Sequence, residues 1–130
     1  MKLSIEDEVA IQRLYNTYNN AADILCDAQA LADCFVEDGS YEHPALGLLE
    51  GRDAIIDTIE PVFDRYQGAI RHWNNNLVID ASTDPVSATI YFLTIDLSGE
   101  APIVAKHGLY NDQLVKTEDG WKFGKRVVSF

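Results

Sequence analysis

The stretch AIRHWNNNLVID (residues 69–80) is typical of a β-strand, but it carries an unusual run of polar side chains. Successive side chains of a strand point to opposite faces. We therefore expect His72, Asn74 and Asn76 on one face, and Trp73 and Leu77 on the other. Three polar groups in a row point either to water or into a cavity that uses them, and the fold of the rest of the chain decides between these cases.

The same stretch opens the β-rich half of the chain. Residues 70–80, 86–98, 102–117 and 121–130 are rich in β-branched and aromatic side chains, and turn signals (STDP, SGEAP and TEDG) separate them. This pattern predicts four strands in antiparallel succession.

The preceding half is mainly helical. Ser4, followed by Asp7 three residues later, resembles a capping box, and apolar residues at helical spacing then continue to Leu25. This predicts a long first helix with one apolar face. A short helix capped by Asp27 is expected over 27–36, followed by a brief strand over 40–44 that Pro44 closes. A third helix is expected over 53–66, with Asp53 as its N-cap and Pro61 inside it.

Helices followed by a run of antiparallel strands predict an α+β fold. At 130 residues, without repeats, linkers or low-complexity tracts, residues 1–130 are expected to form one domain. A strongly twisted sheet wrapped around a long helix leaves a cone with a pocket inside. Such a pocket is a physically sensible place for inward polar groups.

The charge of the chain excludes several kinds of partner. The formal net charge is −11, which repels phosphate backbones and anionic lipid, so neither nucleic acid nor membrane is expected to bind. No apolar run approaches the roughly 18 residues that a membrane span needs. The start, MKLSIEDEVA, turns acidic too early for a signal or transit peptide. Cys26 and Cys34 are expected to be free thiols, which indicates a reducing, cytoplasmic location.

His72 and Asp23 are the first candidates for chemistry. His72 alone is equally compatible with general base catalysis and with inert packing, since imidazole chemistry suits both. Asp23, near the end of the first helix, is compatible with a solvated residue of the final turn. Together they form a familiar pair: an aspartate that binds one imidazole nitrogen fixes the tautomer and leaves the other nitrogen as a base.

Several motifs taken together resemble the SnoaL-like branch of the nuclear-transport-factor-2-like (NTF2-like) superfamily, which includes scytalone dehydratase, hexachlorocyclohexane dehydrochlorinase and bile-acid 7α-dehydratase. The motifs are Y-x-x-x-x-D (18–23), F-x-E-D-G (35–39), EGRDAI (50–55), RHWNNNLVID (71–80) and GLYNDQLVKTEDGWKFGKRVV (108–128). The resemblance covers essentially the whole chain. It implies a cone-shaped barrel with three N-terminal helices on a strongly curved, mainly antiparallel sheet, no cofactor, and a homodimer or homotrimer.

The resemblance also assigns residues. Asp23 and His72 fall where the eliminating enzymes keep their Asp–His pair, and Tyr18 falls where the bile-acid enzyme has a tyrosine. Arg126 matches that enzyme's pattern, although an arginine on a final strand is more often solvated. The chain departs from scytalone dehydratase at Ala22, where that enzyme has a tyrosine, and its second histidine is replaced by apolar residues within YFLTI. These departures concern the substrate more than the reaction type.

Other candidates have a weaker basis. His107 and Asn111 share one face of a strand, where Asn111 is expected to offer a hydrogen bond to a substrate oxygen, with a rim or loop position as the alternative for each. Tyr41 is a possible proton donor toward developing negative charge, whereas His43 is expected at an exposed strand end. Trp73 is expected in the core or in a subunit contact.

Metal and cofactor chemistry have little support. A zinc site built from Asp23, His72 and His107 lacks H-x-x-x-H or C-x-x-C spacing. The two cysteines have no base nearby in sequence, and no glycine-rich phosphate loop is present.

Three functions follow from these observations. The first is a small cofactor-independent lyase or isomerase, of the dehydratase or cyclase type, acting on a hydrophobic cyclic substrate inside the cone. Asp23 and His72 are its expected catalytic residues; its expected substrate-binding residues are Tyr18, Tyr41, His107, Asn111 and Arg126. The second is a cone that binds an apolar small molecule without chemistry. The third is a subunit-assembly module, like the small subunit of a ring-hydroxylating oxygenase.

Overall fold

The computed structural model describes residues 2–130. Three α-helices, one π-helical turn and six strands make up the fold. In chain order they are α1 (Ile5–Asn20), the π-turn η1 (Ala21–Leu25), α2 (Ala28–Ala32), β1 (Phe35–His43), β2 (Gly47–Glu50), α3 (Arg52–Tyr66), β3 (Ile70–Asp80), β4 (Val86–Asp96), β5 (Ile103–Thr117) and β6 (Gly120–Ser129).

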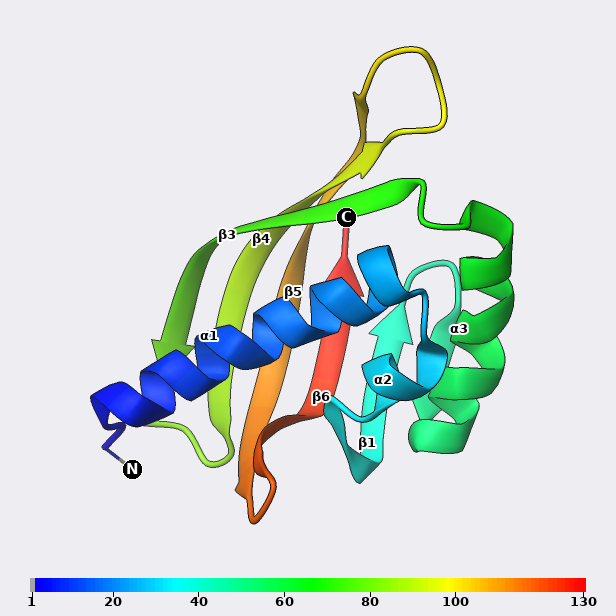
Figure 1. Ribbon diagram of the computed structural model, residues 1–130. Coiled ribbons are helices and arrows are strands. Elements are labelled where there is room, and N and C mark those ends of the chain that lie inside the picture. The colour runs from blue at the N-terminus through cyan, green and yellow to red at the C-terminus, as the bar shows by residue number, and fades with distance from the viewer. Residues whose placement is uncertain (1) are drawn as a thin grey trace.

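The six strands form one curved, open sheet in the order β2-β1-β6-β5-β4-β3. Neighbouring strands are antiparallel except β1 and β6, which are parallel. The long helix α1 lies across the inner face of this sheet, and α2 and α3 lie beside its β1–β2 end (Figure 1). The predicted α+β class and the antiparallel succession of β3 to β6 are confirmed.

The core forms where α1 meets the sheet. The predicted cap of α1 is present, because the Ser4 side chain accepts from the backbone of Asp7 and the Asp7 side chain accepts from the backbone of Ser4. The buried face of α1 then presents Tyr15 and Tyr18, whose rings make edge-to-face contacts with the ring of Phe123. Such aromatic pairs add roughly 0.5–1.5 kcal/mol each beyond the area that they bury.

Two boundaries differ from the sequence expectations. The second helix ends at Ala32, and the chain enters β1 at Phe35, because the Cys34 carbonyl accepts from the Phe123 backbone at 2.8 Å. Gly51, with φ of 87°, is the N-cap of α3, and Asp53 lies in its first turn. Pro61 lies inside α3 without ending it.

A bulge in β3 changes the faces predicted for the opening stretch. The pairing of β3 with β4 shifts register between Asn75 and Val78, and Asn76 has a left-handed backbone with φ of 65°. His72 and Asn74 keep their common inner face, but Asn76 is exposed and Leu77 packs against the core. The assignment of Asn76 to the polar face and of Leu77 to the opposite face was therefore wrong, because one extra residue reverses the alternation.

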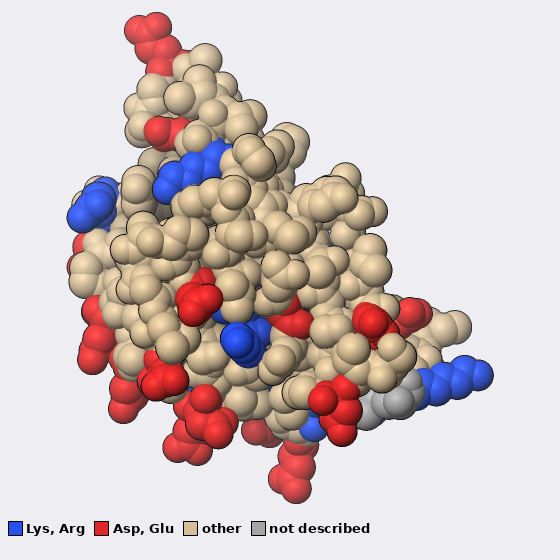
Figure 2. Space-filling view, turned by 180° about the vertical axis from the view of Figure 1, so that it is seen from behind, with Lys and Arg blue, Asp and Glu red and all other residues tan. Residues whose placement is uncertain are grey.

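The convex side of the sheet carries apolar residues that face outward. Trp73 is 65% exposed and Tyr91 is 57% exposed, so the core position given as one alternative for Trp73 was wrong, and the subunit contact stays a prediction. We call this surface the outer sheet face; by strand register it comprises Trp73, Val78, Tyr91, Leu93, Leu109 and Val127. Seen from behind the sheet, much of the upper and right-hand surface is uncharged, and acidic side chains gather along the lower edge (Figure 2).

Asp7 joins the start of α1 to the end of the sheet. Its Oδ1 atom accepts from Trp121 Nε1 at 3.0 Å and lies 2.9 Å from Lys116 Nζ. The hydrogen bonds from Lys116, Trp121 and Ser4 hold the pKa of Asp7 well below its ordinary value of 3.8. A carboxyl group whose pKa is lowered by folding stabilises the fold above its unfolded pKa, and this contribution is lost as the pH falls.

We predict that Asp7→Asn lowers the melting temperature by a few degrees at pH 7, because the substituted amide loses the ion pair. The difference from the unsubstituted chain should shrink as the pH falls below about 4, where the unfolded carboxyl takes up a proton. Thermal unfolding followed by circular dichroism between pH 3 and pH 7 measures both effects. Asp57→Asn, at an exposed position of α3, is the matched control. A pH-independent difference would contradict the assignment.

Candidate active site

The end of the first helix carries Asp23 on a π-helical turn. The α-helical pattern of α1 ends at Asn20, and residues Ala21–Leu25 continue with the wider π spacing. Cys26, in a left-handed conformation with φ of 49°, then closes the turn by donating its backbone N–H to the Ala21 carbonyl. Such turns are rare and are frequently found at functional sites. Here the turn presents the Asp23 carboxylate to the start of β3.

Both oxygens of Asp23 are engaged by His72. The Oδ1 atom lies 2.6 Å from His72 Nδ1, and the Oδ2 atom accepts from the His72 backbone N–H at 2.6 Å. When the Asp23 carboxylate accepts a hydrogen bond from Nδ1–H, the proton stays on Nδ1 and the lone pair of Nε2 is free. Asp23 is buried, whereas 21% of the His72 side chain is exposed. The structure thus brings the two predicted residues together, and their catalytic role stays a prediction.

Neighbouring residues fix the position of this pair. The Arg71 guanidinium donates from Nη1 to the backbone carbonyls of Asp23 at 3.3 Å and Gly68 at 2.7 Å. Asn19, on α1, donates to the His72 carbonyl at 3.4 Å. Gly68 has a φ of 76°, which favours glycine, and it allows the chain to turn sharply from α3 into β3. The loop before β3 is therefore tied to the π-turn at several points.

Arg126 is the most buried charged group of the cone. Its side chain is 0% exposed, so the alternative of a solvated Arg126 was wrong, while its predicted role in substrate binding stays a prediction. It makes two parallel hydrogen bonds to Asp112, from Nε to Oδ1 and from Nη2 to Oδ2, each 2.8 Å long. Tyr15 donates its hydroxyl to the same carboxylate at 2.5 Å. The sequence analysis missed Asp112, although its alternation with Tyr110 and Leu114 on β5 indicates one inward face.

Aromatic rings enclose the guanidinium of Arg126. The distances from its Cζ atom to the ring centroids are 3.7 Å for Tyr110, 4.1 Å for Phe123, 4.4 Å for Tyr18 and 5.1 Å for Tyr15. Burial alone would lower the pKa of Arg126, but the Asp112 carboxylate more than offsets burial and keeps this pKa well above its ordinary value. The guanidinium therefore remains charged at all physiological pH values.

Three buried tyrosines surround the same interior. Tyr18, Tyr41 and Tyr110 come from α1, β1 and β5, and burial raises the pKa of each hydroxyl above its ordinary value of 10.0. Tyr18 and Tyr41 share a side-chain hydrogen bond. All three phenols therefore stay protonated at neutral pH and can act as hydrogen-bond donors. The predicted Tyr18 and Tyr41 lie inside the cone together with Arg126.

Two predicted substrate-binding residues lie on the opposite side of the sheet. Asn111 and His107 share one face of β5, as expected, but both are exposed and belong to the convex side. Asn111 lines a hollow of about 290 Å³ there. Their assignment to the cavity was wrong, because the inward positions of β5 are held by Tyr110 and Asp112.

His43 is partly buried, and burial together with Lys106 lowers the pKa of its ring.

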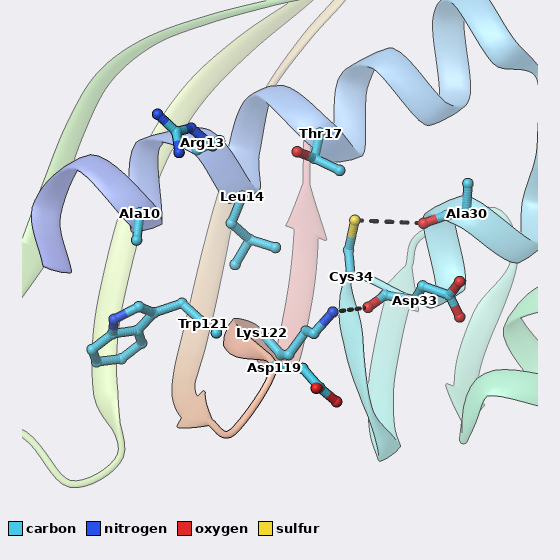
Figure 3. A pocket seen from close by; sticks show the side chains of 11 residues that line it. Ala10, Arg13, Leu14, Thr17, Ala30, Asp33, Cys34, Asp119, Trp121 and Lys122 are labelled. Atoms are coloured by element: carbon cyan, nitrogen blue, oxygen red, sulfur yellow. Dashed lines mark hydrogen bonds between the residues drawn. The ribbon is translucent and has the colours of Figure 1, made fainter. Parts of the chain in front are cut away.

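A further pocket, of about 370 Å³, lies between α1, α2 and the β5–β6 turn, away from Asp23 and His72 (Figure 3). Lys122 donates to the Asp33 carbonyl at 2.7 Å beside it, and Cys34 donates its thiol to the Ala30 carbonyl at 3.6 Å. Burial raises the pKa of the Cys34 thiol to about 11, so the reactive thiolate is disfavoured.

Within residues 2–130, no cluster of three or more His, Cys, Asp or Glu residues is placed to bind a metal ion.

Residues 3–127 match the family model of the SnoaL-like domain. The chain belongs to the SnoaL-like family. No curated protein matches this SnoaL-like chain significantly in sequence. Within the part of the chain that the structure describes, no helix is long and apolar enough to cross a membrane.

Solved structures with the same fold extend the comparison. An NTF2-like protein with a cystatin-like fold from Novosphingobium aromaticivorans is 22% identical, with a TM-score of 0.82 over 95% of this chain and 81% of that one. ActVI-ORFA from Streptomyces coelicolor is 25% identical (TM-score 0.82; 93% of this chain, 95% of that one). A protein from Catenulispora acidiphila, solved in complex with S-DNPA, is 26% identical (TM-score 0.82; 96% and 93%).

We predict that Asp112→Asn destabilises the fold by about 3–5 kcal/mol, because it leaves the buried Arg126 charge without its counter-ion. The double variant Asp112→Leu with Arg126→Met should lose less, since it removes both charges together. Urea unfolding measures both, with Asp119→Asn at an exposed position of the β5–β6 turn as the control. A double variant less stable than Asp112→Asn would show that the pair itself supplies the stability.

Proposed function

We propose that this SnoaL-like protein is a small cofactor-independent lyase or isomerase that uses His72 as its general base. The observation that carries the proposal is the 2.6 Å contact between Asp23 Oδ1 and His72 Nδ1, on a ring that keeps an exposed edge. A base must lie within hydrogen-bond reach of its partner and of the proton that it removes. The exposed edge of the His72 ring supports the second requirement, because a substrate could approach it.

The proposed reaction begins with removal of a proton from carbon. His72 Nε2 takes a proton next to an electron-withdrawing group of a hydrophobic cyclic substrate, and the electrons of the broken C–H bond move toward that group. The imidazolium that forms is stabilised by the Asp23 carboxylate, which needs no proton of its own. In an isomerisation His72 returns the proton to another carbon; in a dehydration it protonates the departing hydroxyl group, which leaves as water.

Inward donors support the developing negative charge in this proposal. The hydroxyls of Tyr18 and Tyr41 stay protonated and lie in a buried setting, where a hydrogen bond to an oxyanion is stronger than in water. Arg126 lies beside these tyrosines, with its charge compensated by Asp112. The structure of the Catenulispora acidiphila protein with S-DNPA supports small-molecule binding by a chain of this fold.

A non-catalytic binding protein is the alternative that the same interior allows. A cone lined by aromatic side chains would hold an apolar ligand without any proton transfer. The two functions differ in what happens to the ligand, because only the enzyme exchanges or removes a carbon-bound proton.

We propose further that two copies associate through the outer sheet face. Trp73 and Tyr91 are exposed there, and exposed apolar clusters of this kind mark interaction sites. A chain with a net charge of −11 repels its own copy except where charges are absent, and the uncharged part of this face offers such a place. A second copy is therefore a better fit than a basic partner, which would need acidic residues on the same face.

The proposal also covers the domain organisation and the cellular location of the protein. Residues 1–130 would act as one domain, as the family match over residues 3–127 suggests. Cys26 and Cys34 are both free. This favours a reducing compartment such as the cytoplasm.

We predict that His72→Ala and Asp23→Asn each lower catalysis by roughly 10²–10⁴-fold, the usual contribution of a general base. Because the substrate is unidentified, the measurement is the exchange of carbon-bound protons for deuterium, followed by NMR in D₂O with a panel of cyclic ketones and β-hydroxyketones. His107→Ala, at an exposed position of β5, is the matched control and should exchange at the rate of the unsubstituted protein. Exchange by His72→Ala at the full rate would refute the mechanism. Tight binding of an unaltered ligand by all variants would support the alternative.

We predict that Trp73→Glu converts the protein from a dimer to a monomer, because it puts like charges opposite each other at the proposed contact. Sedimentation velocity over a concentration series measures the change. Tyr66→Glu, at an exposed aromatic position of α3, is the control and should leave the dimer intact. A monomeric unsubstituted protein at high concentration would contradict the proposal.

A further inference from the structure

The pocket of about 370 Å³ between α1, α2 and the start of β6, called the α1–β6 pocket below, lies outside the cone (Figure 3). Its volume is near the lower end of the range for small-molecule sites, roughly 300–1,000 Å³. Small residues keep the space open. Ala10 and Ala30 line it, and a Cβ atom added at Gly120 would meet no atom within 4 Å outside its chain neighbours. The pocket therefore has room for a small molecule but not for a folded partner.

One side of the α1–β6 pocket is apolar and firmly held. Leu14 is 7% exposed and Trp121 is 6% exposed, and both belong to the core. The Trp121 indole is fixed by its N–H group, which donates to Asp7 at 3.0 Å. A leucine side chain beside an indole offers a surface on which a ring or a short aliphatic chain can pack.

Lys122 places a positive charge beside this apolar side. Its Nζ atom donates to the Asp33 backbone carbonyl at 2.7 Å, which uses one of its three N–H groups. The same charge acts on the Cys34 thiol, another lining residue, and partly offsets the rise in pKa that burial causes there. Lys122 is thus held at the pocket by a neutral partner, and within residues 2–130 its other N–H groups have no acceptor.

The other charged groups around the pocket do not compensate Lys122. Arg13, exposed on α1, also lines the pocket, and among residues 2–130 neither cation forms an ion pair with a carboxylate. The Asp33 carboxylate accepts from Gln29 at 2.9 Å. In Figure 3 this carboxylate and that of Asp119 point away from the gap between α1 and Lys122. Cationic donors beside an apolar surface favour a ligand that is both anionic and apolar.

The net charge of −11 does not exclude such a ligand. Charges on an exposed surface are largely screened beyond about 8 Å at physiological ionic strength. A small anion in the pocket is therefore governed by the two cations beside it, whereas a nucleic acid or an anionic membrane would meet the acidic surface as a whole.

We propose that the α1–β6 pocket is a second ligand site, which binds a small amphipathic carboxylate. The apolar body of the ligand packs on Leu14 and Trp121, and its carboxylate accepts hydrogen bonds from Lys122. The long side chain of Arg13 reaches over the carboxylate from the rim. A neutral apolar ligand would leave these donors unused, and a cation would be repelled by both. The protonated Cys34 thiol offers no nucleophile, so this is a binding site and not a second reaction centre.

The test uses 4-phenylbutanoate and its neutral counterpart 4-phenylbutanamide, which have the same apolar body. The chain has two tryptophans, Trp73 on the outer sheet face and Trp121 in the pocket. Their indole N–H resonances in ¹⁵N-labelled protein distinguish the two locations, and Trp73→Phe assigns them. We expect 4-phenylbutanoate to shift the Trp121 resonance saturably and to leave Trp73 unchanged. The amide should bind about 10-fold more weakly, since it lacks the charge.

Substitutions of the two cations test their roles. Lys122→Gln should weaken 4-phenylbutanoate binding about 10-fold. Arg13→Gln should weaken it about 2–5-fold, because an exposed ion pair contributes less. Neither should change the affinity for the amide. Lys125→Gln, at an exposed position of the same strand as Lys122, is the matched control and should bind both probes like the unsubstituted protein.

Several results would overturn the inference. The first is the absence of a saturable Trp121 shift, and the second is a shift confined to Trp73, which would place the probe on the outer sheet face. Equal affinities for acid and amide would show that the cations contribute nothing. A loss in Lys125→Gln as large as that in Lys122→Gln would indicate a general effect of charge. If Lys122→Gln does not fold, Arg13→Gln and the amide decide. None of these measurements depends on whether His72 acts as a base.

Discussion

The ion pair between Arg126 and Asp112 is the interaction on which the interior of this protein depends. Removing two charges from water costs several kcal/mol per ion, and their attraction repays this only if the geometry is good and the remaining polar atoms are satisfied. Here two parallel hydrogen bonds join the pair, Tyr15 adds a third to the carboxylate, and aromatic rings take the place of water around the guanidinium. These contacts join β5, β6 and α1, so the curvature of the sheet and the position of the helix are set together.

The two carboxylate pairs of the cone differ in what their partners can do. Asp112 faces a guanidinium that stays charged and is sealed, so this pair is static. Asp23 faces an imidazole, which can gain and lose a proton, and the ring keeps an exposed edge. The π-turn at Ala21–Leu25 and the Arg71 hydrogen bonds hold Asp23 in place without using its side-chain oxygens. The static pair is sealed, while the second pair keeps an exposed imidazole edge, as the proposed proton transfer would require.

Much of this arrangement could be predicted from the sequence. The Ser4–Asp7 cap, the four antiparallel strands and the meeting of Asp23 with His72 follow from local spacing and from the family resemblance. The bulge at Asn76 could not be predicted, because asparagine is tolerated in both the extended and the left-handed conformation. The ion pair of Arg126 also escaped prediction, since its partner Asp112 lies 14 positions away and faces it from the neighbouring strand.

The largest error concerned which residues of β5 point inward, and it changes the chemistry assigned to the site. With Asn111 inside, the cone would offer an amide, which both donates and accepts hydrogen bonds and carries no aromatic surface. With Tyr110 and Asp112 inside, it offers a phenol stacked against a ring and backed by a charged guanidinium. Strand alternation has a period of two, so a shift of one position exchanges the two faces completely. The interior therefore offers phenol donors beside an Arg126–Asp112 ion pair whose charges compensate each other, and under the proposed function His72 would act as the base beside these donors.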